Sequence, residues 1–270
     1  MDNRPIGVFD SGLGGLTAVK EFLSVLPHES IVYFGDTGRV PYGSRSKEIL
    51  RVYAQQDIAF LKTKDVKMVV AACGTISSTA GEVGEACGIP YTGVIRPTVL
   101  AALKATKNKR IGVIGTPATI ASGAYEAMLK SLDSSIQIQS LACPLFVPFV
   151  ESGVVDPQDP MVQLVVERYL KIFKGTEIDT LILGCTHYPV LRQAIQNYLG
   201  NGVTLINSGR ETARYCAQLL QKQDMLTSST EIGHHDYYVS DRVEGFYPMA
   251  QLCLERELEA DVHFVEITKY

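Results

Sequence analysis

The amino-acid sequence predicts an α/β protein with two similar lobes, each built on a mostly parallel sheet flanked by helices. Short apolar runs, which are typical of buried strands, alternate with longer segments whose apolar residues recur at helical spacing. The same order of strands and helices occurs twice, and matching segments lie about 105 to 112 residues apart. This regularity predicts two pseudo-symmetric lobes of four parallel strands each, joined by right-handed crossovers, with the active site in the cleft between them.

The first half of the chain contains four predicted strands, over residues 6–9, 31–35, 67–73 and 89–93. A glycine-rich turn over residues 10–15 opens a helix over 16–26, and a loop over 36–44 follows the second strand. Apolar residues at helical spacing predict a long helix over 47–63, and a further helix runs from the third strand to residue 87.

The second half repeats this order. Strands are expected over 111–115, 136–142, 180–184 and 203–206, with helices that open at 116–120 and span 161–173. Pro189 stands where another helix begins, because proline is tolerated in the first turn. The remainder is predicted as a helix over 211–221, a strand over 237–240 and a helix over 249–259. We assign residues 1–94 and 208–270 to the first lobe and residues 95–207 to the second.

Composition and charge restrict the class of protein. The 270 residues are 46% hydrophobic and 20% charged, which is a globular composition. The formal net charge is −4 and the basic residues are scattered, so no nucleic-acid substrate is expected. No apolar run approaches the ~20 residues that span a membrane, and the first residues lack the apolar core of a signal peptide. The six cysteines are widely spaced, which predicts reduced thiols in a cytoplasmic protein.

Two cysteines occupy equivalent positions in the two halves. Cys73 and Cys185 each end an apolar strand and are followed by small or polar residues. Open α/β sheets place their sites at the carboxyl ends of their strands, so both thiols are expected to face the cleft between the lobes. A substrate in that cleft would have one thiol on each side. The other cysteines lack this context and are interpreted as core residues: Cys87, Cys143, Cys216 and Cys253.

Two thiols on opposite sides of a substrate suit the inversion of a carbon centre next to a carboxylate. Such a centre is a very weak acid, and its inversion needs a base on one face and an acid on the other. Two identical groups, one ionised and one protonated, serve both directions. The pKa of a cysteine, ordinarily ~8.5, is lowered by cationic neighbours and helix N-termini, and a helix start is expected after both cysteines.

Several motifs together carry a family resemblance: Gly7-Val-Phe-Asp-Ser-Gly-Leu-Gly-Gly15, Gly35-Asp-Thr37, Pro41-Tyr-Gly43, Ala72-Cys73, Gly115-Thr116, Cys143-Pro-Leu-Phe-Val-Pro148 with Glu151, and Gly184-Cys-Thr-His-Tyr-Pro189. Over essentially its whole length the sequence resembles the glutamate racemase family. These are cofactor-independent bacterial enzymes that interconvert L- and D-glutamate for peptidoglycan synthesis. The resemblance implies glutamate as a small-molecule substrate, no cofactor, and a homodimer.

The resemblance also implies roles for particular residues. Cys73 and Cys185 would be the two acid/base catalysts, with Asp10 and Glu151 assisting proton traffic and His187 acting as orienter or acid. The residues implied in substrate binding are Asp10, Ser11, Pro41, Tyr42, Gly43, Gly74, Thr75, Thr116, Thr119, Thr186 and His187.

One position departs from the family pattern. The family usually has Cys-Asn-Thr where this chain has Cys73-Gly74-Thr75, so a side chain expected to touch the substrate is missing. One lost hydrogen bond is worth ~1 kcal/mol, and backbone donors remain. Two alternatives stay open: a racemase of the same type that acts on aspartate, and a non-catalytic two-lobed protein that binds an acidic amino acid.

Cofactor and metal chemistry are disfavoured by the sequence. A pyridoxal phosphate enzyme is disfavoured because no lysine ends a strand in a context comparable to that of the two cysteines. Cys185 and His187 are separated by one residue, but the chain has no further ligand set with zinc-like spacing, so no metal site is expected.

Overall fold

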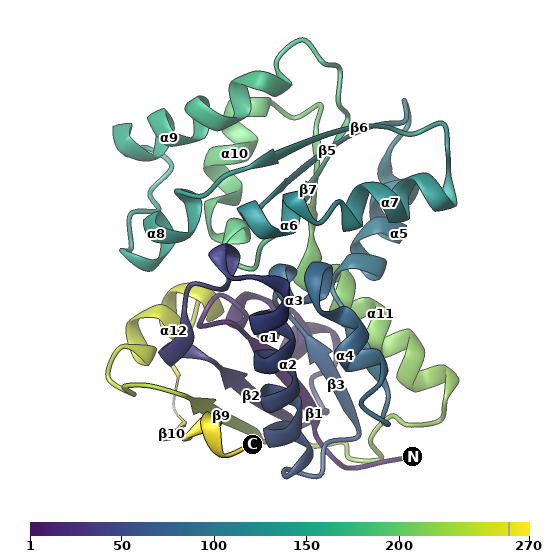
Figure 1. The fold of residues 1–270 in the computed structure, drawn as a ribbon, viewed down its shortest axis with the longest axis vertical. Helices are drawn as coiled ribbons and strands as arrows, with labels where there is room; N and C mark the ends of the chain where they lie inside the picture. The colour runs from purple at the N-terminus through teal and green to yellow at the C-terminus, as the bar shows by residue number, and fades with distance from the viewer. Residues whose placement is uncertain (259) are drawn as a thin grey trace.

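The computed structural model of the chain describes residues 1–258 and 260–270 and has two lobes, each built around its own sheet (Figure 1). The first lobe, which holds both chain termini, lies at the bottom of Figure 1 and the second at the top. The strands of the first sheet come from residues 6–93 and 235–264, and those of the second from residues 110–207. The predicted two-lobed α/β fold is confirmed.

Within the described residues, the first sheet has six parallel strands in the order β10-β9-β2-β1-β3-β4. They are β1 (Ile6–Asp10), β2 (Ile31–Gly35), β3 (Met68–Ala71), β4 (Tyr91–Gly93), β9 (His235–Val239) and β10 (Val262–Phe264). Strand β10 was not predicted, because its three residues are too few to give a recognisable strand pattern.

The second sheet has four parallel strands in the order β6-β5-β7-β8. They are β5 (Arg110–Gly115), β6 (Gln137–Ala142), β7 (Thr180–Leu183) and β8 (Thr204–Asn207). The first sheet contains the same order in β2-β1-β3-β4, so the repeat predicted from the sequence is confirmed. The strands that precede the two cysteines, β3 and β7, therefore take equivalent places in the two lobes.

Helices flank both sheets (Figure 1). Those of the first lobe are α1 (Leu16–Val25), α2 (Lys47–Lys62), α3 (Gly74–Thr79), α4 (Gly81–Glu85), α11 (Ser208–Lys222) and α12 (Phe246–Leu254). Those of the second are α5 (Ile95–Ala105), α6 (Pro117–Ala121), α7 (Ala124–Leu132), α8 (Phe146–Glu151), α9 (Pro160–Leu170) and α10 (Arg192–Leu199). None of the described helices combines the length and apolar character needed to cross a membrane.

Capping side chains set several helix starts. The Asp159 carboxylate accepts a hydrogen bond from the backbone N–H of Met161, and Pro160 occupies the first turn of α9, where an N–H would have no partner within the helix. The Thr116 hydroxyl accepts a hydrogen bond in the same way at the start of α6, which also begins with a proline. Thr116 is thereby fixed at the carboxyl end of β5, the edge of the sheet where Cys185 also lies.

Alternating residues divide the core of the first lobe into two layers. Ile6 and Val8 of β1 pack in the layer that contains α1 and α12, whereas Phe9 packs in the layer that contains α2. Parallel strands are usually buried on both faces, which explains why these strands read as continuous apolar runs. Full burial of each such side chain stabilises the fold by roughly 1.5–3 kcal/mol.

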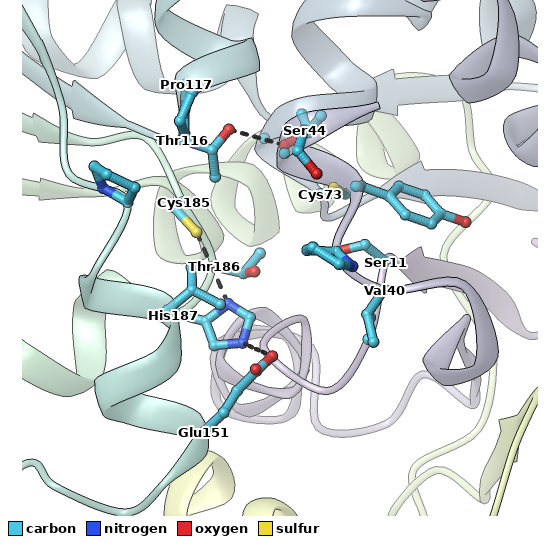
Figure 2. A pocket seen from close by; sticks show the side chains of 18 of the residues that line it. Ser11, Val40, Ser44, Cys73, Thr116, Pro117, Glu151, Cys185, Thr186 and His187 are labelled. Carbon is cyan, nitrogen blue, oxygen red and sulfur yellow. Dashed lines mark hydrogen bonds and ion pairs between the residues drawn. The ribbon is translucent and has the colours of Figure 1, made fainter. Parts of the chain in front are cut away.

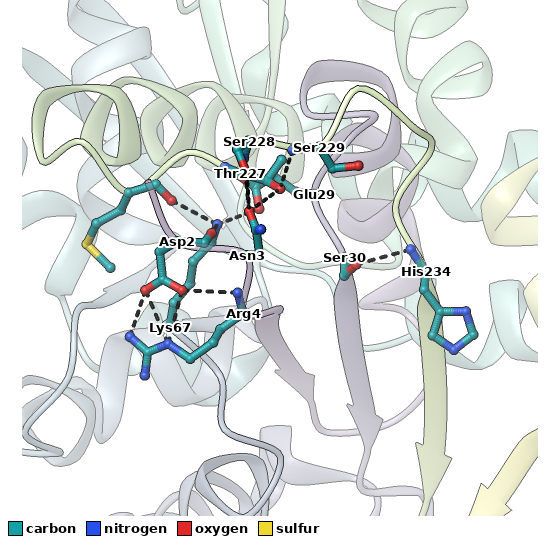
Figure 3. A network of polar contacts seen from close by, with 11 residues as sticks. Asp2, Asn3, Arg4, Glu29, Ser30, Lys67, Thr227, Ser228, Ser229 and His234 are labelled. Atoms are coloured by element: carbon teal, nitrogen blue, oxygen red, sulfur yellow. Dashed lines mark hydrogen bonds and ion pairs between the residues drawn. The ribbon is translucent and has the colours of Figure 1, made fainter.

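A buried ion pair lies at the amino-terminal end of the first sheet (Figure 3). The Lys67 ammonium is 2.6 Å from the Glu29 carboxylate, and the two side chains are 0% and 2% exposed. The Lys67 ammonium also donates hydrogen bonds to the backbone carbonyls of Asp2 and Met225. The Glu29 carboxylate accepts a hydrogen bond from the backbone N–H of Thr227. These contacts, which we call the Lys67 and Glu29 clasp, hold the start of the chain and the segment after α11 against the sheet.

Two predicted helices next to the cysteines differ from the structure. The helix expected to run to residue 87 is two short helices, α3 and α4, because the backbone of Ala80 leaves the helical region at φ −134° and ψ 21°. The helix expected at Pro189 begins only at Arg192, after a 3-10 turn over Tyr188–Leu191. The Tyr188 hydroxyl donates a hydrogen bond to the carbonyl of Cys143, which holds this turn against the start of α8.

The last predicted helix is also shorter than expected. Helix α12 ends at Leu254 because Glu255 adopts a left-handed conformation with φ 55°. Residue 259, where the predicted helix was expected to end, lies outside the described residues.

Candidate active site

A cavity of about 310 Å³ is lined by residues of both lobes (Figure 2). Most of the predicted site residues line it: Ser11, Pro41, Tyr42, Gly43, Cys73, Gly74, Thr75, Thr116, Glu151, Cys185, Thr186 and His187. Two predicted residues, Asp10 and Thr119, are fully buried and do not line the cavity. The structure therefore brings the two strand-end thiols, one from each lobe, to one small space.

Cys73 takes the cap position between β3 and α3, and its side chain is buried. Burial, followed by the charge of Asp10, raises the pKa of Cys73 to about 12. Hydrogen bonds from the backbone N–H of Ile76 and the Ser11 hydroxyl act in the opposite direction but are smaller. The sequence-based expectation of a lowered thiol pKa is therefore wrong for Cys73, because burial outweighs the start of α3.

The second thiol, that of Cys185, contacts a charged histidine, His187. The Cys185 sulfur is 3.8 Å from Nδ1 of His187 (Figure 2). On the other side of the ring, Nε2 of His187 is 3.2 Å from the Glu151 carboxylate. This second contact is an ion pair without hydrogen-bond geometry. Burial opposes a charge on His187, but its contacts with Cys185 and Glu151 and the charge of Asp10 raise its pKa to about 10. His187 therefore carries a proton on both ring nitrogens at neutral pH.

Asp10 lies behind the cavity and contacts both lobes. One of its oxygens accepts backbone N–H groups of Gly15 at 2.8 Å and Gly12 at 3.3 Å, and the other is 3.5 Å from the Thr186 hydroxyl. Burial raises the pKa of Asp10, while the charge of His187 and the backbone donors act against that rise. Asp10 is thus placed to influence the titration of the groups around both thiols.

The glycine-rich turn packs closely against the second lobe. A Cβ atom at Gly14 would lie 2.5 Å from the ring of His187, so this approach requires glycine. The Thr17 hydroxyl, at the start of α1, donates a hydrogen bond of 2.7 Å to the backbone carbonyl of Thr186. The turn therefore fixes the Thr186 and His187 segment relative to the first lobe.

Three threonines form a chain of hydroxyl groups between the lobes. The Thr116 hydroxyl, seen in Figure 2, is 3.0 Å from the Thr75 hydroxyl and 2.9 Å from the Thr119 hydroxyl. Thr119 is 1% exposed and reaches the cavity only through Thr116. It therefore orients Thr116 in this structure, whereas Thr75 and Thr116 offer hydroxyls to the cavity.

Gly74 lies where the backbones of the two lobes meet. A Cβ atom built on Gly74 would stand 2.2 Å from the backbone carbonyl oxygen of Gly184, the residue before Cys185. That contact is with backbone, which cannot swing aside as a flexible side chain can. The absence of a side chain at this position therefore allows the two cysteine-bearing loops to approach each other.

Several cavity-lining residues were not predicted from the sequence: Gly12, Val40, Ser44, Pro117, Pro144, Val147, Pro148 and Tyr188. The apolar ones have no chemistry that marks them in a sequence, although Pro144, Val147 and Pro148 lie within a motif used for the resemblance. In the described part of the chain, no group of three or more His, Cys, Asp or Glu side chains could hold a metal ion.

Comparison with known proteins places this architecture in a family. The sequence pattern of the family described as Asp/Glu/Hydantoin racemase matches residues 21–216. The curated glutamate racemase of Chlorobaculum tepidum is 44% identical over 265 residues, which cover 97% of this chain and 96% of that protein. That of Streptococcus pneumoniae is 45% identical over 264 residues, which cover 97% of this chain and 98% of that protein.

Solved structures give the same result. The glutamate racemase of Francisella tularensis in complex with D-glutamate superposes with a TM-score of 0.92 at 38% identity and covers 100% of both chains. The glutamate racemase of Thermus thermophilus in complex with β-chloro-D-alanine has a TM-score of 0.87 at 38% identity, covering 99% of this chain and 100% of that chain. From the matched pattern, the full-length relatives and the shared two-lobed fold, the chain belongs to the Asp/Glu/hydantoin racemase family and is a racemase, an isomerase.

Proposed function

We propose that this racemase interconverts L- and D-glutamate without a cofactor, by a two-base mechanism in which Cys73 and Cys185 are the bases. The observation that carries this proposal is the placement of two thiols, one from each lobe, in one cavity of about 310 Å³. The glutamate racemases that match this chain over its whole length support glutamate as the substrate.

In this mechanism, glutamate lies with its α-carbon between the two sulfurs. The thiolate on one side removes the α-proton, and the thiol on the other side donates its proton to the opposite face of the carbanion. One C–H bond breaks and another forms, so the substrate is inverted and the two sulfurs exchange protonation states. Family resemblance assigns proton removal from D-glutamate to Cys73 and from L-glutamate to Cys185.

The charged groups around the cavity have distinct tasks in this proposal. The raised pKa of Cys73 favours its thiol form, and the positive charge of the substrate ammonium promotes its ionisation. Asp10 and Ser11 are assigned to that ammonium. His187, protonated and in contact with both Cys185 and Glu151, is assigned to orient Cys185 and to pass protons toward the solvent-exposed Glu151 carboxylate.

The substrate carboxylates need hydrogen-bond donors. We assign this task to the backbone N–H groups of Tyr42 and Gly43, the hydroxyls of Thr75 and Thr116, and the Thr186 segment, all of which line the cavity. Pro41 shapes the loop that presents Tyr42, and Gly74 allows the two cysteine-bearing loops to approach each other.

Exchange of the α-proton with solvent tests the proposal. Each enantiomer of glutamate, and separately of aspartate, is incubated in D₂O with purified protein and no pyridoxal phosphate, and followed by mass spectrometry and chiral chromatography. We expect deuterium at the α-carbon of glutamate together with racemisation. Binding without exchange would identify a non-catalytic binding protein, and exchange confined to aspartate would identify an aspartate racemase.

The biological setting is part of the proposal. We propose that the enzyme supplies D-glutamate for peptidoglycan synthesis in the cytoplasm, where free thiols persist, since all six cysteines are unpaired. The family resemblance further implies a homodimer, and light scattering coupled to size-exclusion chromatography measures that assembly directly.

A further inference from the structure

The loop over residues 36–44 forms one wall of the cavity through Val40, Pro41, Tyr42, Gly43 and Ser44. It contains two short 3-10 turns, Thr37–Arg39 and Tyr42–Ser44, and no strand or α-helix. Few backbone hydrogen bonds are available to such a segment, so side chains must fix its shape.

A buried cluster of side chains holds this loop against α2. The Tyr42 hydroxyl contacts the carboxylates of Asp36, from the same loop, and of Asp57, from α2. Arg39 reaches the same two carboxylates, with Nε 2.5 Å from Asp36 and Nη2 2.8 Å from Asp57. Asp36 and Asp57 are both 0% exposed. The Ser240 hydroxyl supplies a further hydrogen bond to Asp36, at 2.6 Å.

The Tyr42 hydroxyl links the two carboxylates. The Tyr42 hydroxyl has one proton, and its shorter contact is with Asp36, which already accepts from Arg39 and Ser240. The same hydroxyl also donates to an Asp57 oxygen at 3.2 Å, so its one proton is shared between a carboxylate of the loop and a carboxylate of α2. Burial and the adjacent charge of Asp36 raise the pKa of Asp57 well above its ordinary value, whereas the charge of Arg39 and the hydrogen bond from Tyr42 act against that rise.

We propose that Arg39 and Asp57 are positioning residues for substrate binding, with Asp57 accepting hydrogen bonds from Arg39 and Tyr42 so that the 36–44 loop is held in its binding shape. This inference deepens the proposed function and rests on it for the identity of the substrate. Neither residue lines the cavity, and Asp57 lies on a different element from both thiols.

Loss of the contacts between the 36–44 loop and α2 is expected to affect KM and kcat differently. A loop released from α2 would present its backbone N–H groups to the substrate carboxylate in many conformations, which weakens binding. The thiols are held by β3, α3 and the segment after β7, so the proton-transfer step is left largely intact. Loss of Asp57 should therefore raise KM for both enantiomers and change kcat little.

The test compares Asp57→Ala with Asp57→Asn. The asparagine carbonyl still accepts a hydrogen bond from Arg39, so the loop stays tied to α2 without a carboxylate. For Asp57→Ala we expect KM, and the Kd of glutamate by calorimetry, to rise roughly tenfold with kcat within about twofold. For Asp57→Asn we expect both constants within about twofold of the parent protein. An Asp57→Asn variant as impaired as Asp57→Ala would overturn the assignment of hydrogen bonding at Asp57 as the interaction that holds the loop.

Two further variants complete the test. Tyr42→Phe removes one oxygen atom from the centre of the cluster and is expected to raise KM as Asp57→Ala does, which decides the matter even where Asp57→Ala fails to fold. Glu29→Ala removes an equally buried carboxylate of the same lobe, at the opposite end of the sheet, and is expected to lower stability with KM unchanged. Equal KM values for Asp57→Ala, Tyr42→Phe and the parent protein would overturn the inference.

Measurements on the parent protein distinguish a failure of this inference from a failure of the proposed function. A parent protein without glutamate turnover would contradict the proposed function, and the Kd of glutamate in the same variants would still decide whether Asp57 positions the loop. A parent protein that turns over normally, with variants whose KM and Kd are unchanged, would contradict the positioning role alone.

Discussion

The two cysteines that line the cavity have different surroundings. Cys73 is buried near the charge of Asp10, which raises its pKa, whereas Cys185 contacts the protonated ring of His187. Pseudo-symmetric strands therefore deliver chemically identical groups into unequal environments. In the proposed two-base mechanism, this inequality requires that the substrate and His187 supply the charge that lets the two thiols exchange roles.

Replacement of either cysteine by serine is expected to abolish racemisation. A serine hydroxyl is a far weaker acid than a thiol, so Cys73→Ser and Cys185→Ser should each lower kcat by ~10³-fold or more. Each variant is expected to retain HCl elimination from one enantiomer of a β-chloro substrate analogue, because elimination needs a base on only one face. Cys216→Ala, a buried cysteine away from the cavity, is the control and should remain active. Full racemisation by either serine variant would contradict the two-base mechanism.

The contact between Gly74 and Gly184 makes a second prediction at the residue scale. Gly74→Ala places a Cβ atom 2.2 Å from the Gly184 carbonyl oxygen, so the loops that carry the thiols must move apart. We expect kcat/KM for glutamate to fall roughly tenfold or more in steady-state assays, because small displacements of reacting groups are costly. Gly81→Ala, where a Cβ atom meets nothing within 4 Å, is the matched control.

Gly74→Asn, which restores the side chain usual in the family, separates two explanations of the departure at this position. The close contact predicts that the asparagine variant also loses activity on glutamate. An improved KM for this variant, in line with ~1 kcal/mol for one recovered hydrogen bond, would show instead that the glycine merely weakens a conventional glutamate site. Parallel assays on aspartate would reveal a change of substrate.

At the scale of elements, the carboxyl ends of both sheets form the site, whereas the amino end of the first sheet contributes to stability. The carboxyl ends of β1, β3, β5 and β7 lead directly into the segments that line the cavity, as expected for open α/β sheets. The amino end of the first sheet carries the Lys67 and Glu29 clasp, which joins segments distant in sequence and touches no cavity residue. Changes at this end are therefore expected to affect stability more than catalysis.

Lys67→Met tests this separation. The substitution leaves the Glu29 carboxylate buried without its partner, which typically costs ~3–5 kcal/mol. We expect the free energy of unfolding in urea to fall by about that amount, while kcat and KM of the folded protein stay near the parent values. The double variant Lys67→Met with Glu29→Gln should recover part of the loss, because no buried charge remains. A large change in KM without loss of stability would contradict this assignment.

At the scale of the whole molecule, contacts around the cavity join the two lobes. The Thr17 hydroxyl bonds to the Thr186 carbonyl, Thr75 meets Thr116, and the ring of His187 rests on the glycine-rich turn. The cavity is therefore formed by the arrangement of the lobes, and neither lobe alone contains both thiols. Any change that separates the lobes is expected to act on the relative placement of the two cysteines.

The charge of His187 makes the stability of the folded protein depend on pH. Its pKa, ordinarily 6.5, rises to about 10 in the folded protein, so the folded state binds this proton more tightly than the unfolded state. The resulting stability is fully present below about pH 6.5 and is lost as the pH rises through about 10, with a magnitude on the order of a few kcal/mol.

Urea unfolding at several pH values between 6.5 and 9.5 measures this effect. The parent protein should lose stability across this range, and His187→Gln should lose less, because it lacks the titrating ring. Buried cysteines that titrate above this range affect both proteins alike. Parallel profiles for the two proteins would contradict the proton linkage.

The sequence by itself determined the strands, their duplication and the placement of the two cysteines. These features depend on local patterns: apolar periodicity, turn residues such as the Asp10–Gly15 stretch, and proline at helix starts. Equivalent positions in a repeat then placed Cys73 and Cys185 at corresponding sheet edges, and motif resemblance indicated most of the residues that line the cavity. Short elements such as β10, and the break at Ala80, left no comparable pattern.

Only the tertiary structure decided how those residues affect one another. The raised pKa of Cys73 comes from burial and from Asp10, which lies far away in the sequence. The contact of Gly74 with Gly184, and that of Asp57 with Tyr42, likewise join separate elements. Local sequence patterns report which residues prefer a helix, strand or turn, whereas burial and charge interactions depend on which distant segments pack together. The chemistry of this site is therefore set by the packing of the two lobes.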